Sequence, residues 1–346
     1  MIRLKGRTAR RIYGVLLGLG LMTSGLFSAQ VFKYGKAKPE NGHLIQTVPF
    51  EKWLKINYCG PACLTMVLNS WDETRSFSQR KIADEIFDSG SQATYNSELV
   101  LYPRTQGFES YSFQGTLQIL KDLVSKDIPV IVLTKTIKQV GKGHYRVVIG
   151  FDDDKGQIIF HDPLFGGRRA MKTKSFMKVW ELGKGRNLSR WMMAVVPGQS
   201  AFPFPALQND PLTSINLATA YYRRSDFQKS IELWEDVKEA LGQDPYPLYS
   251  LGMISLRQGR FAEAEQYALE ALGVDANSAY AHDVLGLAYA NQGKMLQAFQ
   301  SLGQARRLAP KEEFIRAHYL QVRALYIEGA RLEYIQKKEK SNEKMG

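Results

Sequence analysis

The sequence predicts two folded domains, an α+β domain over residues 47–200 followed by an all-α solenoid of helical repeats over residues 211–312. The chain has 346 residues, 44% of them hydrophobic, which suits about two domains. In the first part, stretches with helical periodicity precede strand-like runs, as in α+β domains. Beyond these lies a regular 34-residue repeat. The segment 201–210, rich in proline at its start, predicts a linker between the two parts.

The net charge is strongly positive, but its distribution does not indicate a nucleic-acid-binding protein. The formal charge is +12, from 46 Lys and Arg against 34 Asp and Glu. A group of these basic residues lies near the N-terminus, and the rest are scattered without an interleaved aromatic and basic motif. We therefore expect no nucleic-acid partner. For an exported basic protein, electrostatic attraction to an anionic envelope surface is the more natural expectation.

Residues 1–29 predict a signal peptide or a short membrane anchor. Basic residues precede an apolar run from Ile12 to about Phe27 that contains no acid. The run, roughly 16 residues, is short for a spanning helix, and it ends in an imperfect cleavage site. Because the basic flank stays in the cytoplasm, we expect the domains to be exported, whether periplasmic, extracellular or anchored. Residues 30–46 are then a linker.

Cys59 is the candidate nucleophile. It precedes Pro61, which suits a first helical turn, and apolar residues continue from there with helical spacing to Trp71. Unpaired N–H groups and the positive dipole end at a helix N-terminus favour a thiolate. Cys63, one turn later, is expected in the core. A disulfide between the two cysteines is disfavoured, because one helical turn is an awkward span for disulfide geometry, and two cysteines are too few for a disulfide framework.

A candidate base and an orienting carboxylate follow on a predicted hairpin. Residues His144 to Phe151 alternate as a strand, in which His144 lies on one face and Tyr145 on the other. A turn at 152–156 leads to a second strand that ends at Asp162. This hairpin brings Asp162 beside His144, within about one or two residues of register. The carboxylate can therefore fix the tautomer of the imidazole.

Two further roles are open to residues of this hairpin. His161 is an alternative base, but in an extended strand it points away from its neighbour Asp162. The run Asp152, Asp153 and Asp154 resembles part of a calcium loop, yet such a loop needs further spaced oxygen ligands and a closing glutamate. We therefore interpret the run as a solvated turn and expect neither a metal nor an organic cofactor.

Taken together, these residues resemble the C39-like peptidases, which are papain-fold cysteine peptidases. The resemblance covers about residues 48–197 and rests on the Cys-Gly-Pro-Ala sequence from Cys59, on the His-Tyr strand from His144, and on Asp162-Pro163. It implies a papain-like fold and a catalytic set of Cys59, His144 and Asp162. It also implies a peptide or protein as the substrate, hydrolysed without a cofactor.

Trp53 departs from the family pattern. The family usually places a glutamine six residues before the cysteine, where its amide helps to hold the oxyanion. Loss of such a donor costs about 10² to 10³ in turnover. Asn57 is a candidate replacement donor and Gln46 a weaker one. The alternatives are a slow enzyme, an inactive domain that works as a protein-binding scaffold, or a cysteine-dependent acyltransferase.

The remaining framework can be outlined from periodicity. Helices are expected at 78–87 and 115–125, and a buried strand at 128–133. In the second domain, the 34-residue spacing places equivalent residues at Leu217, Leu251 and Leu285. This pattern resembles three tetratricopeptide repeats, which implies a protein partner on the concave face or, alternatively, a structural spacer. Residues 313–346 are expected to form a capping helix and a solvated, charged tail.

Overall fold

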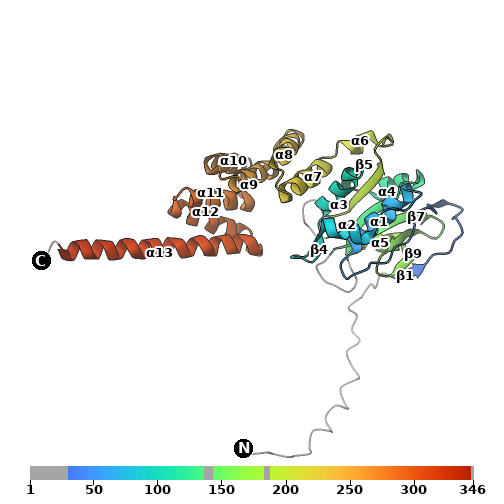
Figure 1. Ribbon diagram of the computed structural model, residues 1–346, viewed down its shortest axis with the longest axis horizontal. Helices are drawn as coiled ribbons and strands as arrows, with labels where there is room; N and C mark the ends of the chain where they lie inside the picture. The colour runs from blue at the N-terminus through green and yellow to red at the C-terminus, as the bar shows by residue number, and fades with distance from the viewer. Residues whose placement is uncertain (1–29, 136–142, 183–187, 344–346) are drawn as a thin grey trace, which may run out of the picture.

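The computed structural model describes residues 30–135, 143–182 and 188–343, and it shows a sheet-containing region followed by an array of helices (Figure 1). The predicted signal segment, residues 1–29, lies outside the described residues. Within the described part, no helix is both long enough and apolar enough to cross a membrane. The predicted order of an α+β domain followed by an all-α solenoid is confirmed.

The first region is built on an antiparallel sheet of eight strands. Seven strands lie in the order β1-β9-β8-β7-β6-β10-β5, and β2 pairs with β7 beyond the point where β6 ends. A separate two-stranded ribbon joins β3 and β4. The strands are β1 (Val31–Lys33), β2 (Gly42–Leu44), β3 (Phe87–Asp88), β4 (Ala93–Thr94), β5 (Phe108–Gln114), β6 (Val130–Lys135), β7 (Gly143–Asp152), β8 (Gln157–Asp162), β9 (Gly166–Lys172) and β10 (Trp191–Pro197).

Residues 30–46 are part of this sheet, which corrects the expectation of a linker. β1 pairs with β9, and β2 pairs with the last residues of β7. Tyr34 then packs inward and donates a hydrogen bond of 2.6 Å to Asp152. The segment forms strands because it can complete the open side of β9 and the uncovered end of β7, whose backbone groups would otherwise lack partners.

Five helices pack against the large sheet or beside it. The predicted helices at 78–87 and 115–125 are confirmed as α2 and α4, whereas α3 and α5 were not predicted. Residues Cys59 to Asn69 of α1 are all buried, as the apolar sequence of this helix predicts. On α5, Phe176 and Trp180 cover the sheet next to Phe160. The helices are α1 (Cys59–Trp71), α2 (Gln79–Ile86), α3 (Asn96–Thr105), α4 (Leu117–Ser125) and α5 (Thr173–Trp180).

The second region consists of helix pairs that recur at the predicted spacing. The first helices begin at residues 211, 245 and 279, and their partners begin at residues 227, 261 and 295. Close packing inside a pair requires small residues: a Cβ added at Gly286 would lie 2.5 Å from Cγ of Leu302. The helices are α7 (Pro211–Arg223), α8 (Phe227–Leu241), α9 (Pro245–Arg257), α10 (Phe261–Val274), α11 (Ala279–Asn291) and α12 (Met295–Leu308).

The ends of the helical region differ in part from the sequence expectation. The predicted linker 201–210 contains the short helix α6 (Pro205–Gln208), and Phe202 within it is buried against Tyr111. After the third pair, α13 (Glu313–Glu343) begins 34 residues after α11. Its backbone stays helical well into the segment expected to be a solvated or disordered tail (Figure 1).

The first repeat helix is fixed to the sheet-containing region. Thr213 on α7 exchanges two hydrogen bonds of 2.9 and 3.0 Å with the backbone of Ser112 on β5, and both residues are buried. Two arginines at the other end of α7 form ion pairs: Arg223 with Asp88 at 2.7 Å and Arg224 with Glu98 at 2.8 Å. α7 is therefore bound to the first region near both of its ends.

Candidate active site

Cys59 is the first residue of α1, where the sequence placed it. The residue before it, Tyr58, provides no side-chain cap, so the first amides of the helix are not satisfied by a capping side chain. The thiol is free and only 8% exposed. Thr94 lies so close that a Cβ at position 60 would be 2.9 Å from its Cβ, which explains why glycine follows the cysteine. The sulfur therefore lies at the positive end of a helix whose backbone is closely packed.

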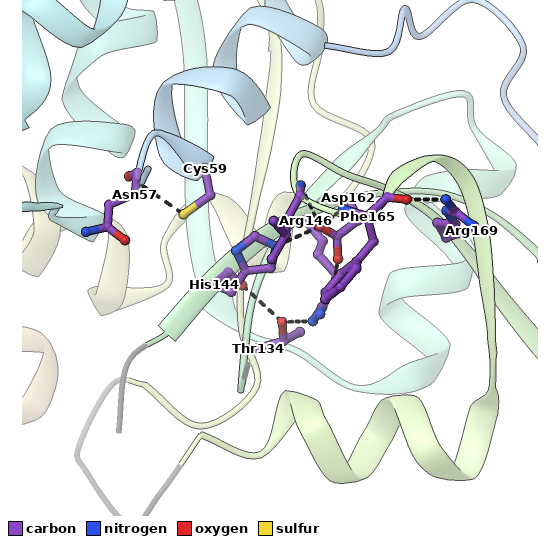
Figure 2. Close-up of polar contacts among 9 residues, drawn as sticks. Asn57, Cys59, Thr134, His144, Arg146, Asp162, Phe165 and Arg169 are labelled. Carbon is purple, nitrogen blue, oxygen red and sulfur yellow. Dashed lines mark hydrogen bonds and ion pairs between the residues drawn. The ribbon is translucent and has the colours of Figure 1, made fainter. Parts of the chain in front are cut away.

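The structure brings the three predicted residues together. His144 lies on β7, and its Nε2 is 2.8 Å from Oδ1 of Asp162 at the end of β8. The imidazole lies between the sulfur of Cys59 and this carboxylate (Figure 2). The strand register pairs Val147 with His161, so Asp162 falls opposite residue 146, two residues from His144. This is within the range of register that the hairpin predicts.

The ionisation of the site favours a thiolate and imidazolium pair. Burial raises the pKa of the Cys59 thiol, but the hydrogen bond and charge of His144, helped by backbone N–H groups, outweigh burial and hold this pKa below its ordinary value. Burial lowers the pKa of His144, yet its bonds to Asp162 and Cys59 raise that pKa above the ordinary value overall. The sulfur is therefore ionised at a lower pH than a free thiol, as a nucleophile requires.

Arg146 is a member of the cluster that the sequence reasoning missed. Its Nε donates a hydrogen bond of 2.7 Å to Oδ2 of Asp162, and the arginine is 1% exposed. Burial raises the pKa of Asp162, but the bond from His144 and the charge of Arg146 hold it well below its usual range. The signal was present in the sequence, since residues two apart on a strand share a face and Arg146 follows His144 by two.

Asn57 and Trp53 lie next to the catalytic candidates Cys59 and His144. The backbone of Asn57 adopts a positive φ of 70°, and its carbonyl oxygen is 4.0 Å from Sγ of Cys59. Trp53 packs edge-on against His144, with ring centroids 6.0 Å apart, and its backbone N–H donates to the carbonyl of Pro163. Gln46 is exposed. At position 53, therefore, an aromatic ring covers the imidazole.

Cys63, His161 and the three aspartates at 152–154 are engaged in other contacts. Cys63 is fully buried and not disulfide-bonded, and burial raises its pKa well above the ordinary value. His161 faces away from Asp162: its Nε2 contacts the carbonyl of Val48 at 3.1 Å and its Nδ1 accepts the N–H of Arg168. Each of the three consecutive aspartates at 152–154 bonds protein donors. Across the ranges that the structure describes, no three His, Cys, Asp or Glu side chains are grouped as metal ligands would be.

The comparison with protein families agrees with this geometry. Residues 45–187 match the model of the Peptidase_C39 like family, and this range includes Cys59, His144 and Asp162. The chain carries a C39-like peptidase domain. The match ends before the helical array, so the C39-like domain corresponds to most of the sheet-containing region.

Comparison with solved structures gives similarities to each region, whereas no curated protein matches the chain. The C39-like domain is similar to the peptidase domain of Streptococcus ComA, a bi-functional ABC transporter, at 22% identity over 43% of this chain and 98% of that chain, with a TM-score of 0.36. The helical array is similar to the second TPR domain of human RPAP3 (18% identity, 32% of this chain, 92% of that chain, TM-score 0.29). It is also similar to the TPR domain of Arabidopsis OM64 (17% identity, 33% of this chain, 94% of that chain, TM-score 0.30).

Proposed function

We propose that this protein is an exported cysteine peptidase that hydrolyses peptide bonds at Cys59 and recruits a protein through its repeats. The observation that carries the proposal is the buried cluster of Cys59, His144 and Asp162 within the C39-like domain. Export rests on the basic and apolar pattern of residues 1–29. Cell fractionation tests that part: deleting residues 1–29 is expected to retain the protein in the cytoplasm.

The proposed reaction proceeds in two steps. The Cys59 thiolate attacks the carbonyl carbon of a peptide bond, and the carbonyl electrons move to oxygen, where the amide of Cys59 can donate a hydrogen bond. The imidazolium of His144 gives its proton to the departing amine, which leaves a thioester. Water, deprotonated by His144, then attacks the thioester, so the acid is released and the thiol returns. Asp162 stabilises the imidazolium throughout.

Trp53 supports a second candidate function, an inactive domain that acts as a binding scaffold. An aromatic ring stands where the family usually has the side-chain amide that holds the oxyanion, and it covers His144. In the scaffold, Cys59 would titrate as an ordinary thiol near pH 8.5. The ionisation of Cys59 therefore separates the two candidates.

The first prediction concerns the alkylation rate of Cys59 by iodoacetamide as a function of pH. In the full chain carrying Cys63→Ala, the rate is expected to reach a plateau well below pH 8, because the pKa of Cys59 is lowered by His144. Adding His144→Ala is expected to remove the plateau and return the thiol to ordinary behaviour. Mass spectrometry of the modified peptide measures both rates. An ordinary titration of Cys59 before His144 is changed would favour the scaffold.

The repeats offer a surface for recruitment that lies apart from the cluster. Tyr246, Tyr280 and Phe314 occupy the second position of successive first helices, at intervals of 34 residues. Tyr280 stacks on Tyr249 at 5.3 Å and on Phe314 at 5.9 Å. Tyr280 is 38% exposed and Phe314 43% exposed, so this aromatic strip is open to a partner.

The second prediction assigns substrate capture to the aromatic strip. Replacing Tyr280 and Phe314 together with alanine is expected to raise KM for an unfolded protein such as reduced casein about ten-fold, since two aromatic anchors are lost. The kcat, and both constants for a short fluorogenic peptide that cannot reach the repeats, should stay unchanged. Leu296→Ala, which removes an exposed apolar side chain from a second helix, is the matched control. Equal effects on both substrates would contradict recruitment by the strip.

A further inference from the structure

The cluster around Asp162 continues beyond the three residues of the proposed mechanism. Arg146 donates from Nε to Oδ2 of Asp162 at 2.7 Å, and a second guanidinium nitrogen donates to Oγ1 of Thr134. Thr134 in turn donates to the backbone carbonyl of His144 at 3.0 Å. With the contact between His144 and Asp162, these bonds close a ring that begins and ends at His144 (Figure 2).

We propose that Arg146 is a positioning residue of this site, which fixes Asp162 against Nε2 of His144 and neutralises the carboxylate. The inference rests on the proposed function, because it assigns a role within the same site. Arg146 does not touch the reacting atoms. Its guanidinium lies over the ring of Phe160, 5.5 Å from the centroid, on the side that α5 covers with Phe176.

Hydrogen bonds to both oxygens of Asp162 hold its carboxylate in place. Oδ1 lies 2.8 Å from His144 and accepts the backbone N–H groups of Leu164 and Phe165 at 2.9 and 3.1 Å, while Oδ2 accepts from Arg146. Donors on both sides leave the carboxylate little freedom to rotate away from the imidazole. Nε2 of His144 is thereby engaged, and Nδ1 remains for Cys59.

Arg146 also balances the charge of the site. In the active form, the cluster holds the Cys59 thiolate, the His144 imidazolium, the Asp162 carboxylate and the Arg146 guanidinium, so two negative and two positive charges lie together. Without Arg146 the buried cluster carries one uncompensated negative charge. Such a charge disfavours the thiolate and favours the imidazolium, since both then gain a proton more readily.

The other titratable groups nearby do not supply this compensation. Cys63 on α1 lies within the electrostatic reach of Asp162 and Arg146, but burial raises its pKa well above the ordinary value, so it stays neutral. Burial likewise raises the pKa of Tyr145, the β7 neighbour on the opposite face. His161 on β8 points away, and burial lowers its pKa to about 4. The positive charge that faces Asp162 opposite His144 is therefore that of Arg146.

The test is the pH profile of Cys59 alkylation in the full chain carrying Cys63→Ala. The profile has two limbs, one for ionisation of the Cys59 thiol and one for deprotonation of the His144 imidazolium. Arg146→Met is expected to move the pH of both limbs upward by about one unit, because a nearby buried positive charge is lost. Arg146→Lys should keep the limbs in place, since it restores the charge. Thr134→Val leaves the charge but breaks the ring, so it should leave the limbs unmoved and lower the plateau rate about five-fold.

The outcomes separate this inference from the proposed function. An ordinary thiol titration before Arg146 is altered overturns the proposed function. An activated Cys59 whose limbs stay in place in a folded Arg146→Met protein overturns the role of Arg146 alone. If Arg146→Met does not fold, Thr134→Val still decides, because it is isosteric: an unchanged plateau rate overturns positioning by the ring.

Discussion

Replacing Asp162 with leucine is expected to lower the free energy of unfolding by about 3–5 kcal/mol, because the change leaves Arg146 buried without its counter-ion. Arg146 is 1% exposed, and Asp162 is the carboxylate with which it pairs among the residues that the structure describes. Turnover should fall by about 10⁴ in the same variant, since His144 loses the group that orients it. Urea unfolding followed by circular dichroism measures the stability.

The matched control is the double variant Asp162→Leu with Arg146→Met. A buried ion pair replaced as a unit by apolar residues is often close to neutral, whereas removal of one partner is costly. The double variant should therefore recover most of the stability lost by the single one, while its activity stays low. The Arg146→Met variant is measured alone as well. If the stability lost by the double variant equals the sum of the losses in Asp162→Leu and Arg146→Met, Arg146 and Asp162 are not coupled, and Arg146 does not balance the charge of the site.

The three residues of the candidate site could be predicted because local patterns place each of them. A proline two residues after Cys59 marks the start of a helix, alternation sets the face of His144, and a short turn fixes the register of Asp162. Arg146 could not be assigned in this way. A buried arginine is stable only beside a carboxylate, and the position of that carboxylate follows from the folded hairpin.

The fold shows the same division between periodic and irregular features. The repeats were predictable because the helices begin at intervals of 34 residues, with small residues where the helices meet. β1 and β2 have three residues each, too few to show an alternation, and they form only because the sheet offers unpaired edges. The helix α3 contains Pro103 near its end, which lowers its sequence signal.

The contact between the two regions could not be predicted from the sequence pattern either. Ser112 and Thr213 are polar and small, and their sequence context gives no reason to expect them to be buried. They satisfy each other's hydrogen bonds across 101 residues, which the folded arrangement alone reveals. α7, the first helix of the array, is therefore bound directly to the C39-like domain.

His161 provides a pH-dependent contribution to stability that is separate from catalysis. Its Nδ1 accepts the N–H of Arg168 at 3.0 Å, and Nε2 lies 3.1 Å from the carbonyl of Val48, so the neutral tautomer with a proton on Nε2 satisfies both partners. A second proton would face the amide hydrogen of Arg168. Burial, with the charge of Arg168, outweighs the bond to Val48 and lowers the pKa of His161 to about 4.

The free energy of unfolding is therefore expected to decrease as the pH falls from about 6.5 to about 4. The unfolded chain binds a proton at His161 in this range and the folded chain does not, so a shift of roughly 2.5 units is worth about 3 kcal/mol. The pKa of Asp162 is depressed, so the stability that this residue contributes is lost only when the pH falls below its ordinary value near 3.8. The pKa of His144 is raised, so the stability that it contributes is lost only when the pH rises above 6.5.

The measurement is a series of urea unfolding curves from pH 4 to 7 for the wild type and for His161→Gln. Glutamine does not titrate and carries both a donor for Val48 and an acceptor for Arg168, so it keeps the contacts of the neutral imidazole. The difference in stability between the two proteins should change by about 3 kcal/mol across this range, with the wild type losing more as the pH falls. A constant difference would mean that His161 is protonated in the folded protein as readily as in the unfolded chain, and the burial argument for this residue would fail.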